Sequence, residues 1–125
     1  MTTKAIGDIG EKAAAKYLKK SGYKIKGRNI HLSHNEIDIV AEDSEYLVFA
    51  EVKTRTGDPS APSSYGVPSS AVNYKKREHL IDAARDYLRL KPTKKQPRMD
   101  VLEVWLNDEK KVISINHIRN AYGAK

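Results

Sequence analysis

The stretch at residues 36–53 reads EIDIVAEDSEYLVFAEVK, and it decides the fold because it has the pattern of a β-hairpin with charges in unusual places. Two runs rich in β-branched and aromatic residues, 36–42 and 45–53, flank a polar turn, which predicts two antiparallel strands. Carboxylates are rare in the strands of a core. The acidic residues inside both runs therefore need an explanation.

The expected pairing of this hairpin places its charges together. A two-residue turn at 43–44 pairs Glu36 with Glu51 and Asp38 with Phe49. Because side chains alternate between the faces of a strand, one face is almost wholly apolar, and Ile37 and Ile39 lie on it. The other face is apolar in the middle and ionisable at one end. Apolar residues on both faces predict that both are covered by helices.

This register makes Asp38 and Glu51 diagonal neighbours, with Cβ atoms roughly 7 to 8 Å apart or slightly less. Lys53 follows on the same face, about 6.6 Å along the strand from Glu51. The prediction depends on an even number of turn residues. A three-residue turn without a compensating bulge would put the two carboxylates on opposite faces and would remove the site.

The rest of the chain has the periodicity of an α/β protein. Apolar residues at helical spacing predict two helices, and alternating residues predict three further strands. A stretch rich in Pro, Gly and Ser predicts a long loop of the kind that forms lids or stays disordered. The expected helices are residues 4–21 and 71–90, the strands are residues 23–28, 99–106 and 111–115, and the loop is residues 54–70.

These elements predict a single three-layer α/β domain over residues 1–125, in which helices flank a mixed central sheet. The chain has 125 residues, of which 39% are hydrophobic and 31% are charged, a composition typical of globular proteins. No cysteine is present, which excludes disulfides, thiolate catalysis and zinc held by cysteine. Neither a membrane-spanning run nor a secretion signal is visible, so we expect a cytoplasmic protein without membrane partners.

The net charge of the chain indicates a polyanionic partner. Lys and Arg number 23 against 16 Asp and Glu, which gives a formal net charge of +7. A basic domain concentrates polyanions around it, and contacts with phosphates release counterions. Nucleic acid is the leading candidate, and a lysine-rich solvated surface is the alternative.

The carboxylates at the end of the hairpin favour a metal site. Asp38 and Glu51 can both reach one ion between them, and Mg²⁺ binds through one or two carboxylates while it keeps several waters. Carboxylates gathered at one partly covered place repel each other, and a single Lys53 cannot neutralise them. A bound divalent cation would stabilise the cluster and could promote phosphodiester hydrolysis. The alternative is a strand end decorated with solvated charges.

The motif D-x(12)-E-x-K, formed by Asp38, Glu51 and Lys53, resembles the core of the PD-(D/E)xK superfamily. That superfamily includes restriction endonucleases and archaeal Holliday junction resolvases. The chain more closely resembles the small bacterial YraN-type family, which is named as endonucleases largely from its fold. The residues that carry this resemblance are G-x-x-A-x-x-Y-L at 10–18 in the form GEKAAAKYL, RN at 28–29, EID at 36–38, EVK at 51–53, YL at 87–88 and RMD at 98–100.

The resemblance implies a restriction-endonuclease-like fold and assigns roles to four residues. Asp38 and Glu51 become metal ligands, and Lys53 orients the nucleophile or steadies the charge of the transition state. Glu11 matches the helix carboxylate that completes the site in the resolvase-like branch. The implied cofactor is Mg²⁺ or Mn²⁺, the implied partner is duplex or branched DNA, and a homodimer would let two sites cut two strands.

Basic residues near both ends of the second helix are candidates for binding phosphates, which position a duplex without reading its sequence. For Arg98, an internal ion pair with Asp100 is an equal alternative. The candidate nucleic-acid-binding residues are Arg28, Lys75, Lys76, Arg77 and Arg98.

We expect a Mg²⁺-dependent nuclease in which the metal held by Asp38 and Glu51, with help from Glu11, activates a water for in-line attack. Lys53 completes this constellation. The first alternative is a nucleic-acid-binding module that keeps the fold without turnover. The second is a non-catalytic assembly protein whose hairpin charges contact a partner.

Overall fold

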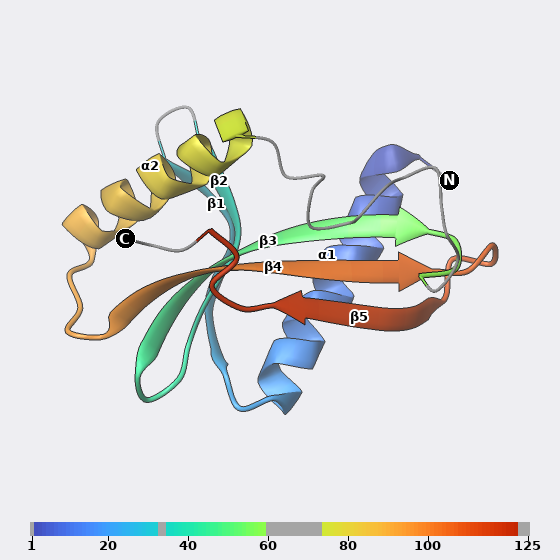
Figure 1. Ribbon diagram of the computed structural model, residues 1–125, viewed down its shortest axis with the longest axis horizontal. Coiled ribbons are helices and arrows are strands. Elements are labelled where there is room, and N and C mark those ends of the chain that lie inside the picture. Colours follow the sequence, from blue (N-terminus) through green and yellow to red (C-terminus); the bar gives the residue numbers. More distant parts are fainter. Residues whose placement is uncertain (1, 33–34, 60–73, 123–125) are drawn as a thin grey trace.

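The computed structural model describes residues 2–32, 35–59 and 74–122, without the side chains of 74–76. Within this part of the chain, two helices pack on a five-stranded sheet (Figure 1). Its elements are α1 (Thr3–Lys20), β1 (Lys24–Leu32), β2 (Asn35–Glu42), β3 (Tyr46–Thr56), α2 (Tyr74–Leu90), β4 (Gln96–Leu106) and β5 (Val112–Ile118).

The sheet is mixed, as predicted. The strands follow the order β1-β2-β3-β4-β5, and every neighbouring pair is antiparallel except β3 and β4. Those two run parallel from the pair Tyr46 and Gln96 to the pair Thr56 and Leu106. Parallel strands need a crossover connection, and α2 lies within that connection. β3 and β4 are therefore joined by a connection that contains α2.

Helix α1 begins and ends where its sequence provides caps. The side chain of Thr2 accepts a hydrogen bond from the backbone nitrogen of Ala5 at 3.1 Å, which satisfies one of the free N–H groups of the first turn. Gly22 follows the helix with a φ of +97°, a conformation that glycine adopts without steric strain. The predicted helix at residues 4–21 is thus confirmed to within one residue at each end.

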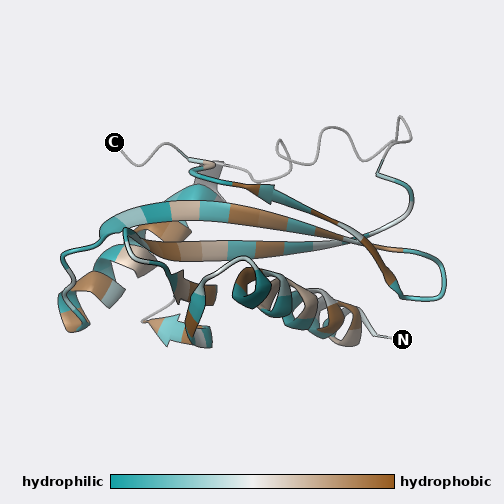
Figure 2. Cartoon of the chain, turned by 90° about the horizontal axis from the view of Figure 1, so that it is seen from below, coloured by the Kyte–Doolittle hydropathy of each residue, from teal (hydrophilic) through white to brown (hydrophobic). Residues whose placement is uncertain are grey.

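Each helix covers one face of the sheet, which confirms the predicted three-layer architecture. The small and apolar side chains of α1, such as Ala14 and Leu18, pack with β-strand residues that include Ile39 and Val48. On the opposite face, Tyr87 of α2 meets Phe49 of β3 edge to face, with ring centroids 5.5 Å apart. Figure 2 shows α1 lying along one side of the sheet and hydrophobic bands running through the strands.

Several strands are longer than the sequence pattern predicts. β1 continues to Leu32 and β5 to Ile118, and β4 begins at Gln96 because its first residue already pairs with Tyr46. β3 continues to Thr56, so the first three residues of the predicted loop belong to a strand. Residues 60–70 of that loop and residues 71–73 of the predicted second helix lie outside the described residues.

The turn of the central hairpin lies one residue later than predicted. The backbone nitrogen of Asp43 donates to the carbonyl of Tyr46 at 3.1 Å, so the turn residues are 44–45 instead of 43–44. The cause is the side chain of Asp43, which accepts hydrogen bonds from the backbone nitrogens of Glu45 and Tyr46 at 2.8 and 2.7 Å. In such Asx turns the side chain binds backbone N–H groups two or three residues further on and so fixes the start of the turn. Phe49 consequently pairs with Val40 instead of Asp38.

Alternation along β2 breaks at Asp38, which corrects the expected faces. Ile37 packs in the cluster beneath α2, whereas Ile39 packs in the cluster beneath α1, although the two were expected on one face. In the neighbouring strand, Asn29 has a φ of +50°, a conformation that asparagine tolerates better than most residues. The sheet is therefore irregular around Asn29 in β1 and Asp38 in β2.

The chain carries no helix suited to crossing a bilayer, as far as the structure describes it: none combines the necessary length with sufficient apolar character.

Candidate functional site

Asp38 lies at the point where β2 leaves β3. The residue pairs of these strands extend as far as Ile39 and Ala50. One step further, the Oδ2 atom of Asp38 accepts a hydrogen bond from the backbone nitrogen of Val52 at 2.8 Å. A side-chain carboxylate thus binds a backbone group that a continuing strand would have paired. This contact fixes Asp38 against β3, one residue from Glu51.

The environment of Asp38 disfavours its ionised form. Burial is the main reason that the pKa of this carboxyl rises from 3.8 to about 6. The N–H of Val52 acts in the opposite direction, and the negative charges of Glu51, Glu11 and Glu36 add to the increase. A carboxyl whose pKa is raised by burial and by neighbouring negative charges is frequent at functional sites.

Glu51 is buried on β3, where Lys53 and Tyr122 contact its carboxylate. The ammonium of Lys53 lies 3.4 Å from Oε1. The hydroxyl of Tyr122 donates a hydrogen bond to Oε2 at 2.8 Å. The side chain of Lys53 keeps 18% of its surface exposed, so its charge remains accessible from the site.

Tyr122 reaches Glu51 from beyond the last strand and is held there by Arg77. The guanidinium of Arg77 lies over the ring, 5.0 Å from its centroid, and Nη2 contacts the carbonyl of Tyr122 at 3.5 Å. Burial, followed by the neighbouring Glu51, raises the pKa of Tyr122 far above its usual value. Tyr122 is therefore a permanent donor. Sequence reasoning missed it, because nothing in its spacing marks a partner 71 residues away.

Glu11 projects from α1 towards β1 and is nearly buried, with 8% of its surface exposed. Its Oε1 atom accepts a hydrogen bond from Asn29 Nδ2 at 2.8 Å and contacts Arg28 through Nε and Nη2, both at 3.2 Å. Asn29, which has a left-handed backbone, thus directly contacts Glu11, a candidate metal ligand. Arg28, a predicted phosphate-binding residue, contacts Glu11 in this structure.

One hollow gathers most of the predicted catalytic residues. It has a volume of about 310 Å³ and lies between the N-terminal half of α1 and the strands β1, β2 and β3. Glu11, Asp38 and Lys53 line it together with Glu36 and Asn29, whereas Glu51 is not among its lining residues. The structure therefore brings three of the four predicted residues around one space. Glu51 is linked to them through Lys53 and through its effect on Asp38.

A ready-made cage for a metal is not present in the described part of the chain. No three Asp, Glu, His or Cys side chains converge there closely enough to hold an ion together. The donors that the site offers are carboxylates, which are hard oxygen ligands suited to Mg²⁺ or Mn²⁺. Mg²⁺ needs only one or two carboxylates, since water completes its coordination. The donor set thus fits such an ion through Asp38 and Glu51.

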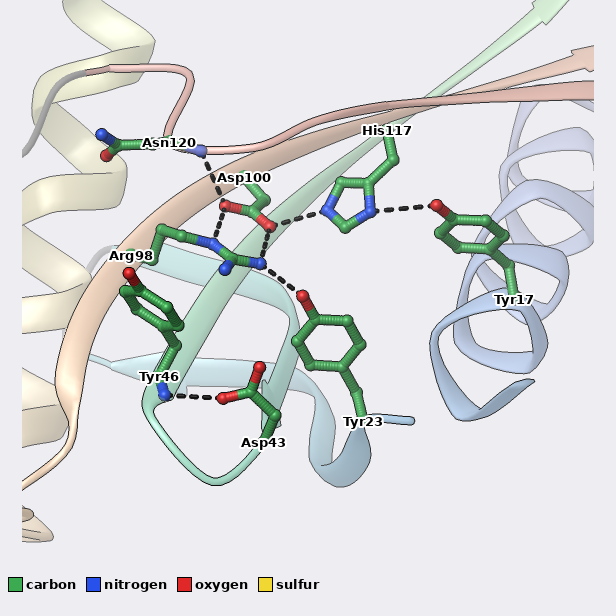
Figure 3. Close-up of polar contacts among 8 residues, drawn as sticks. All are labelled: Tyr17, Tyr23, Asp43, Tyr46, Arg98, Asp100, His117 and Asn120. Atoms are coloured by element: carbon green, nitrogen blue, oxygen red, sulfur yellow. Dashed lines mark hydrogen bonds and ion pairs between the residues drawn. The ribbon is translucent and has the colours of Figure 1, made fainter. Parts of the chain in front are cut away.

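Arg98 lies in an internal ion pair, the alternative that its position next to Asp100 suggested. Its Nε and Nη2 atoms bind the two oxygens of Asp100 at 2.9 and 2.8 Å, and Nη2 also donates to the hydroxyl of Tyr23 at 2.7 Å (Figure 3). Arg98 is 8% exposed and Asp100 is fully buried. This arginine is therefore held mainly by internal partners, Asp100 and Tyr23.

Further groups converge on Asp100 and keep it charged. His117 Nε2 lies 2.7 Å from Oδ2, and the backbone nitrogen of Asn120 donates to Oδ1 at 3.0 Å. The other ring nitrogen of His117 lies 3.1 Å from the hydroxyl of Tyr17 on α1. Burial alone would raise the pKa of Asp100, but the hydrogen bonds from His117 and Arg98 hold it below its usual value. The network thus ties α1 to β4 and β5.

Lys75 and Lys76 lie in the first turn of α2, next to Arg77. Their side chains are outside the described part of the structure, so their predicted contact with nucleic acid stays a prediction.

Comparison with known proteins gives one consistent result. Residues 10–104 match the sequence model of the uncharacterised protein family UPF0102. A UPF0102 protein of Caldanaerobacter subterraneus is 42% identical over 121 residues, which is 95% of each chain. Another from Clostridium acetobutylicum is 42% identical over 120 residues, or 95% of this chain and 94% of the relative. One from Caldicellulosiruptor saccharolyticus is 37% identical over 123 residues, or 98% of this chain and all of the relative.

Proposed function

The chain belongs to the uncharacterised protein family UPF0102, and from that premise we propose that it is a metal-dependent nuclease that hydrolyses phosphodiester bonds in DNA. The observation that carries this proposal is the arrangement around Asp38. Burial and three neighbouring carboxylates raise its pKa to about 6, and Lys53 lines the same hollow. Such a group of acids is stabilised by a cation.

In this proposal, Asp38 and Glu51 would hold a Mg²⁺ or Mn²⁺ ion, which would supply Lewis-acid stabilisation to a phosphoryl oxygen. Tyr122 fixes the orientation of Glu51, and Val52 fixes that of Asp38. Glu11 keeps Arg28 and Asn29 in place through Oε1. Glu11 would help to hold the ion through a bridging water, since no three acidic side chains of the described residues converge on one point.

Lys53 has the role of a charge partner for the reacting phosphate. Its Nζ atom lies 3.4 Å from Glu51, and its side chain is partly exposed to the hollow. An ammonium at this place can orient the nucleophile or stabilise negative charge that develops on the phosphate. The resemblance of Asp38, Glu51 and Lys53 to the PD-(D/E)xK motif supports the same assignment.

The substrate in this proposal is duplex or branched DNA. The excess of 23 basic over 16 acidic residues supports a polyanionic substrate, because phosphate contacts release counterions. The resemblance to Holliday junction resolvases favours branched DNA and a homodimer with two sites.

The experiment is cleavage of end-labelled duplex, single-stranded and four-way-junction DNA with Mg²⁺, Mn²⁺ or a chelator. Asp38→Asn and Lys53→Met are compared with the wild type, and Asp108→Asn in the exposed turn after β4 is the matched control. We expect metal-dependent cleavage by the wild type and by the control, and a loss of at least about a hundredfold in both site variants. Equal cleavage by all four proteins would identify a contaminant and would contradict the proposal.

A second function, a nucleic-acid-binding module without turnover, is favoured by one observation. The carboxylates of Glu11 and Glu51 already have internal partners in Arg28, Asn29 and Tyr122. Binding of DNA that weakens with salt, combined with no cleavage of any substrate with either metal, would decide for the module.

A further inference from the structure

A second polar hollow lies where β3 and β4 begin, away from the proposed nuclease site. It has a volume of about 640 Å³ and is formed by the first residues of β3 and β4 and by the residues that come after β5. Glu51 is five residues further along β3 than Tyr46, which lines this hollow. Since a strand rises about 3.3 Å per residue, the hollow is about 17 Å away from Glu51 along the strand. It is separate from the proposed nuclease site.

Arg98 lines the hollow, and Asp100 and Tyr23 fix the orientation of its guanidinium. Asp100 binds Nε and Nη2 of Arg98, and Tyr23 binds Nη2 as well. In the part of the chain that the structure describes, the hydrogen bonds of Arg98 involve these two nitrogens and not Nη1. The guanidinium carbon lies 4.7 Å from the centroid of the Tyr46 ring. Figure 3 shows Nη1 on the side away from Tyr23, without a partner among the residues drawn.

The arrangement around Arg98 fixes the orientation of its guanidinium as well as contributing to stability. A buried ion pair gains little over apolar residues of similar size, because both charges lose their hydration. Here Asp100 is completely buried, and two further groups from His117 and Asn120 bind it. Beyond stability, the network provides a guanidinium with one fixed orientation. Ligand sites often have donors with a fixed orientation. The conformational entropy of such a side chain is already lost before the ligand binds, so binding costs less.

The other residues around the hollow are also mainly donors. Arg119 is exposed and supplies a second guanidinium, and Asn120 and Gln96 contribute amides. Glu45 is the only carboxylate among the described residues that line it. Asp100 neutralises Arg98 and Glu45 opposes Arg119, so attraction here depends on directed hydrogen bonds more than on net charge. Two guanidinium groups and two amides suit a compact oxyanion with several acceptor oxygens.

We propose that this hollow binds the phosphate group of a phosphomonoester, with Arg98 Nη1 and Arg119 as its main donors. The phosphate can belong to a free nucleotide or to the end of a nucleic-acid strand. Both present the same chemistry to the hollow, and they differ in the size of the group that is esterified to the phosphate. This inference does not depend on nuclease activity, since it involves neither Asp38 nor Glu51.

The test is an NMR titration of the full-length protein with inorganic phosphate, in which the Nε–Hε resonance of Arg98 is followed. Potassium chloride at the same ionic strength is the reference. We expect a saturable shift with phosphate and none with chloride. Arg119→Ala should weaken phosphate binding about tenfold, in line with the loss of one charge-assisted hydrogen bond. Arg85→Ala, which removes an exposed arginine on α2, should bind like the wild type.

Two results would overturn the proposal: equal shifts with phosphate and chloride, or unchanged phosphate affinity in Arg119→Ala. Arg119 is exposed, so its replacement leaves the folded structure intact and the comparison valid. Three more ligands identify the source of the phosphate: a deoxynucleoside 5′-monophosphate and one oligonucleotide with and without a 5′-phosphate.

Tighter binding of the 5′-phosphorylated oligonucleotide than of the nucleotide would assign the hollow to strand ends. Tighter binding of the nucleotide would assign it to free phosphate esters. If the oligonucleotide caused the same shift at Arg98 with and without its terminal phosphate, the phosphomonoester would be excluded.

Discussion

The hydroxyl of Tyr122 donates a 2.8 Å hydrogen bond to Oε2 of Glu51, although the two residues are 71 positions apart in the chain. Tyr122 is itself held between its contact with Glu51 and the guanidinium of Arg77. The last described segment of the chain therefore orients a candidate metal ligand in the middle of the sheet.

Tyr122→Phe should weaken the binding of Mn²⁺ about tenfold or more, because the second partner of a ligand typically contributes that much to metal affinity. It should also lower the free energy of unfolding by about 1 to 3 kcal/mol, since one oxygen of Glu51 loses its donor. Isothermal titration with Mn²⁺ and urea unfolding measure the two effects.

Tyr87→Phe is the matched control for this substitution. Tyr87 is buried in the same apolar cluster, and its hydroxyl makes no hydrogen bond within the described residues. If both variants lost Mn²⁺ affinity equally, the bond between Tyr122 and Glu51 would have no specific role. If the wild type did not bind Mn²⁺, the proposed metal site itself would be wrong.

Asp38→Asn should stabilise the metal-free protein at pH 8. Folding raises the pKa of Asp38 from 3.8 to about 6, so the native state binds more protons than the unfolded state between these values. Protonation of Asp38 therefore stabilises the native state fully below pH 3.8, and this stabilisation is lost as the pH rises through about 6. For an increase in pKa of this size, the ionised carboxylate lowers the free energy of unfolding at pH 8 by about 3 kcal/mol at most.

Urea unfolding of Asp38→Asn and wild type at pH 8 and at pH 4 tests this expectation. Asn can still accept the N–H of Val52, so the comparison isolates the charge. A variant less stable than the wild type at pH 8 would show that the carboxylate is favourable there and would contradict the repulsion described above.

Divalent cations should stabilise the protein more strongly as the pH rises through about 6. The ion binds an ionised Asp38, so protons compete with it below that pH. At a concentration of 100 times Kd, the stabilisation at pH 8 should approach about 2.7 kcal/mol. Thermal unfolding with Mn²⁺ or chelator between pH 5 and 8 measures this, and Asp38→Asn should lose the dependence. An increase in melting temperature that was independent of pH would place the ion elsewhere.

Asp100→Asn should lower the free energy of unfolding by about 3 to 5 kcal/mol, because Arg98 would remain buried with an uncompensated charge. The exposed pair of Asp82 and Arg85, with 3.9 Å between Oδ1 and Nη1, is the comparison. Asp82→Asn should change the stability by less than about 1 kcal/mol. Equal losses in urea unfolding would mean that the network around Asp100 is no stronger than a surface contact.

Gly10→Ala should destabilise the protein by about 1 to 3 kcal/mol through overpacking. A Cβ at this position would lie 2.8 Å from Cβ of Thr54 and would collide with its Oγ1. Gly7→Ala, one helical turn earlier on α1, has open space around the new methyl group and should gain about 1 kcal/mol in helix propensity. Thermal unfolding of the two variants measures these changes in stability. If both variants were stabilised or both destabilised, the close approach of α1 to β3 would be contradicted.

Much of the layered fold was predictable because hydrophobic periodicity follows secondary structure directly. The hairpin survived an error in its turn, since 43–44 and 44–45 are both two-residue turns and the alternation of faces was preserved up to Ile39. The error itself arose because the side chain of Asp43 selects the turn, and a pattern of apolar residues does not report such a bond.

The details of the site were less predictable, because they depend on backbone and on distant segments. The break at Asp38 involves a left-handed residue, Asn29, in a neighbouring strand. The partner of Glu51 comes from beyond β5. For Arg98 the sequence allowed a surface role or an ion pair with Asp100, and only the packing of Tyr23 and His117 around them decided between these.

The crossover between β3 and β4 also determines the order in which the site can form during synthesis. The hairpin that carries Asp38 and Glu51 is complete once residue 56 has been made. At that stage β3 has no neighbour on its second edge, and the hydroxyl of Tyr122 does not yet exist. A nascent chain thus exposes an unpaired strand next to a group of repelling carboxylates until β4 emerges. Asp38 and Glu51 therefore leave the ribosome well before Tyr122, the residue that orients Glu51.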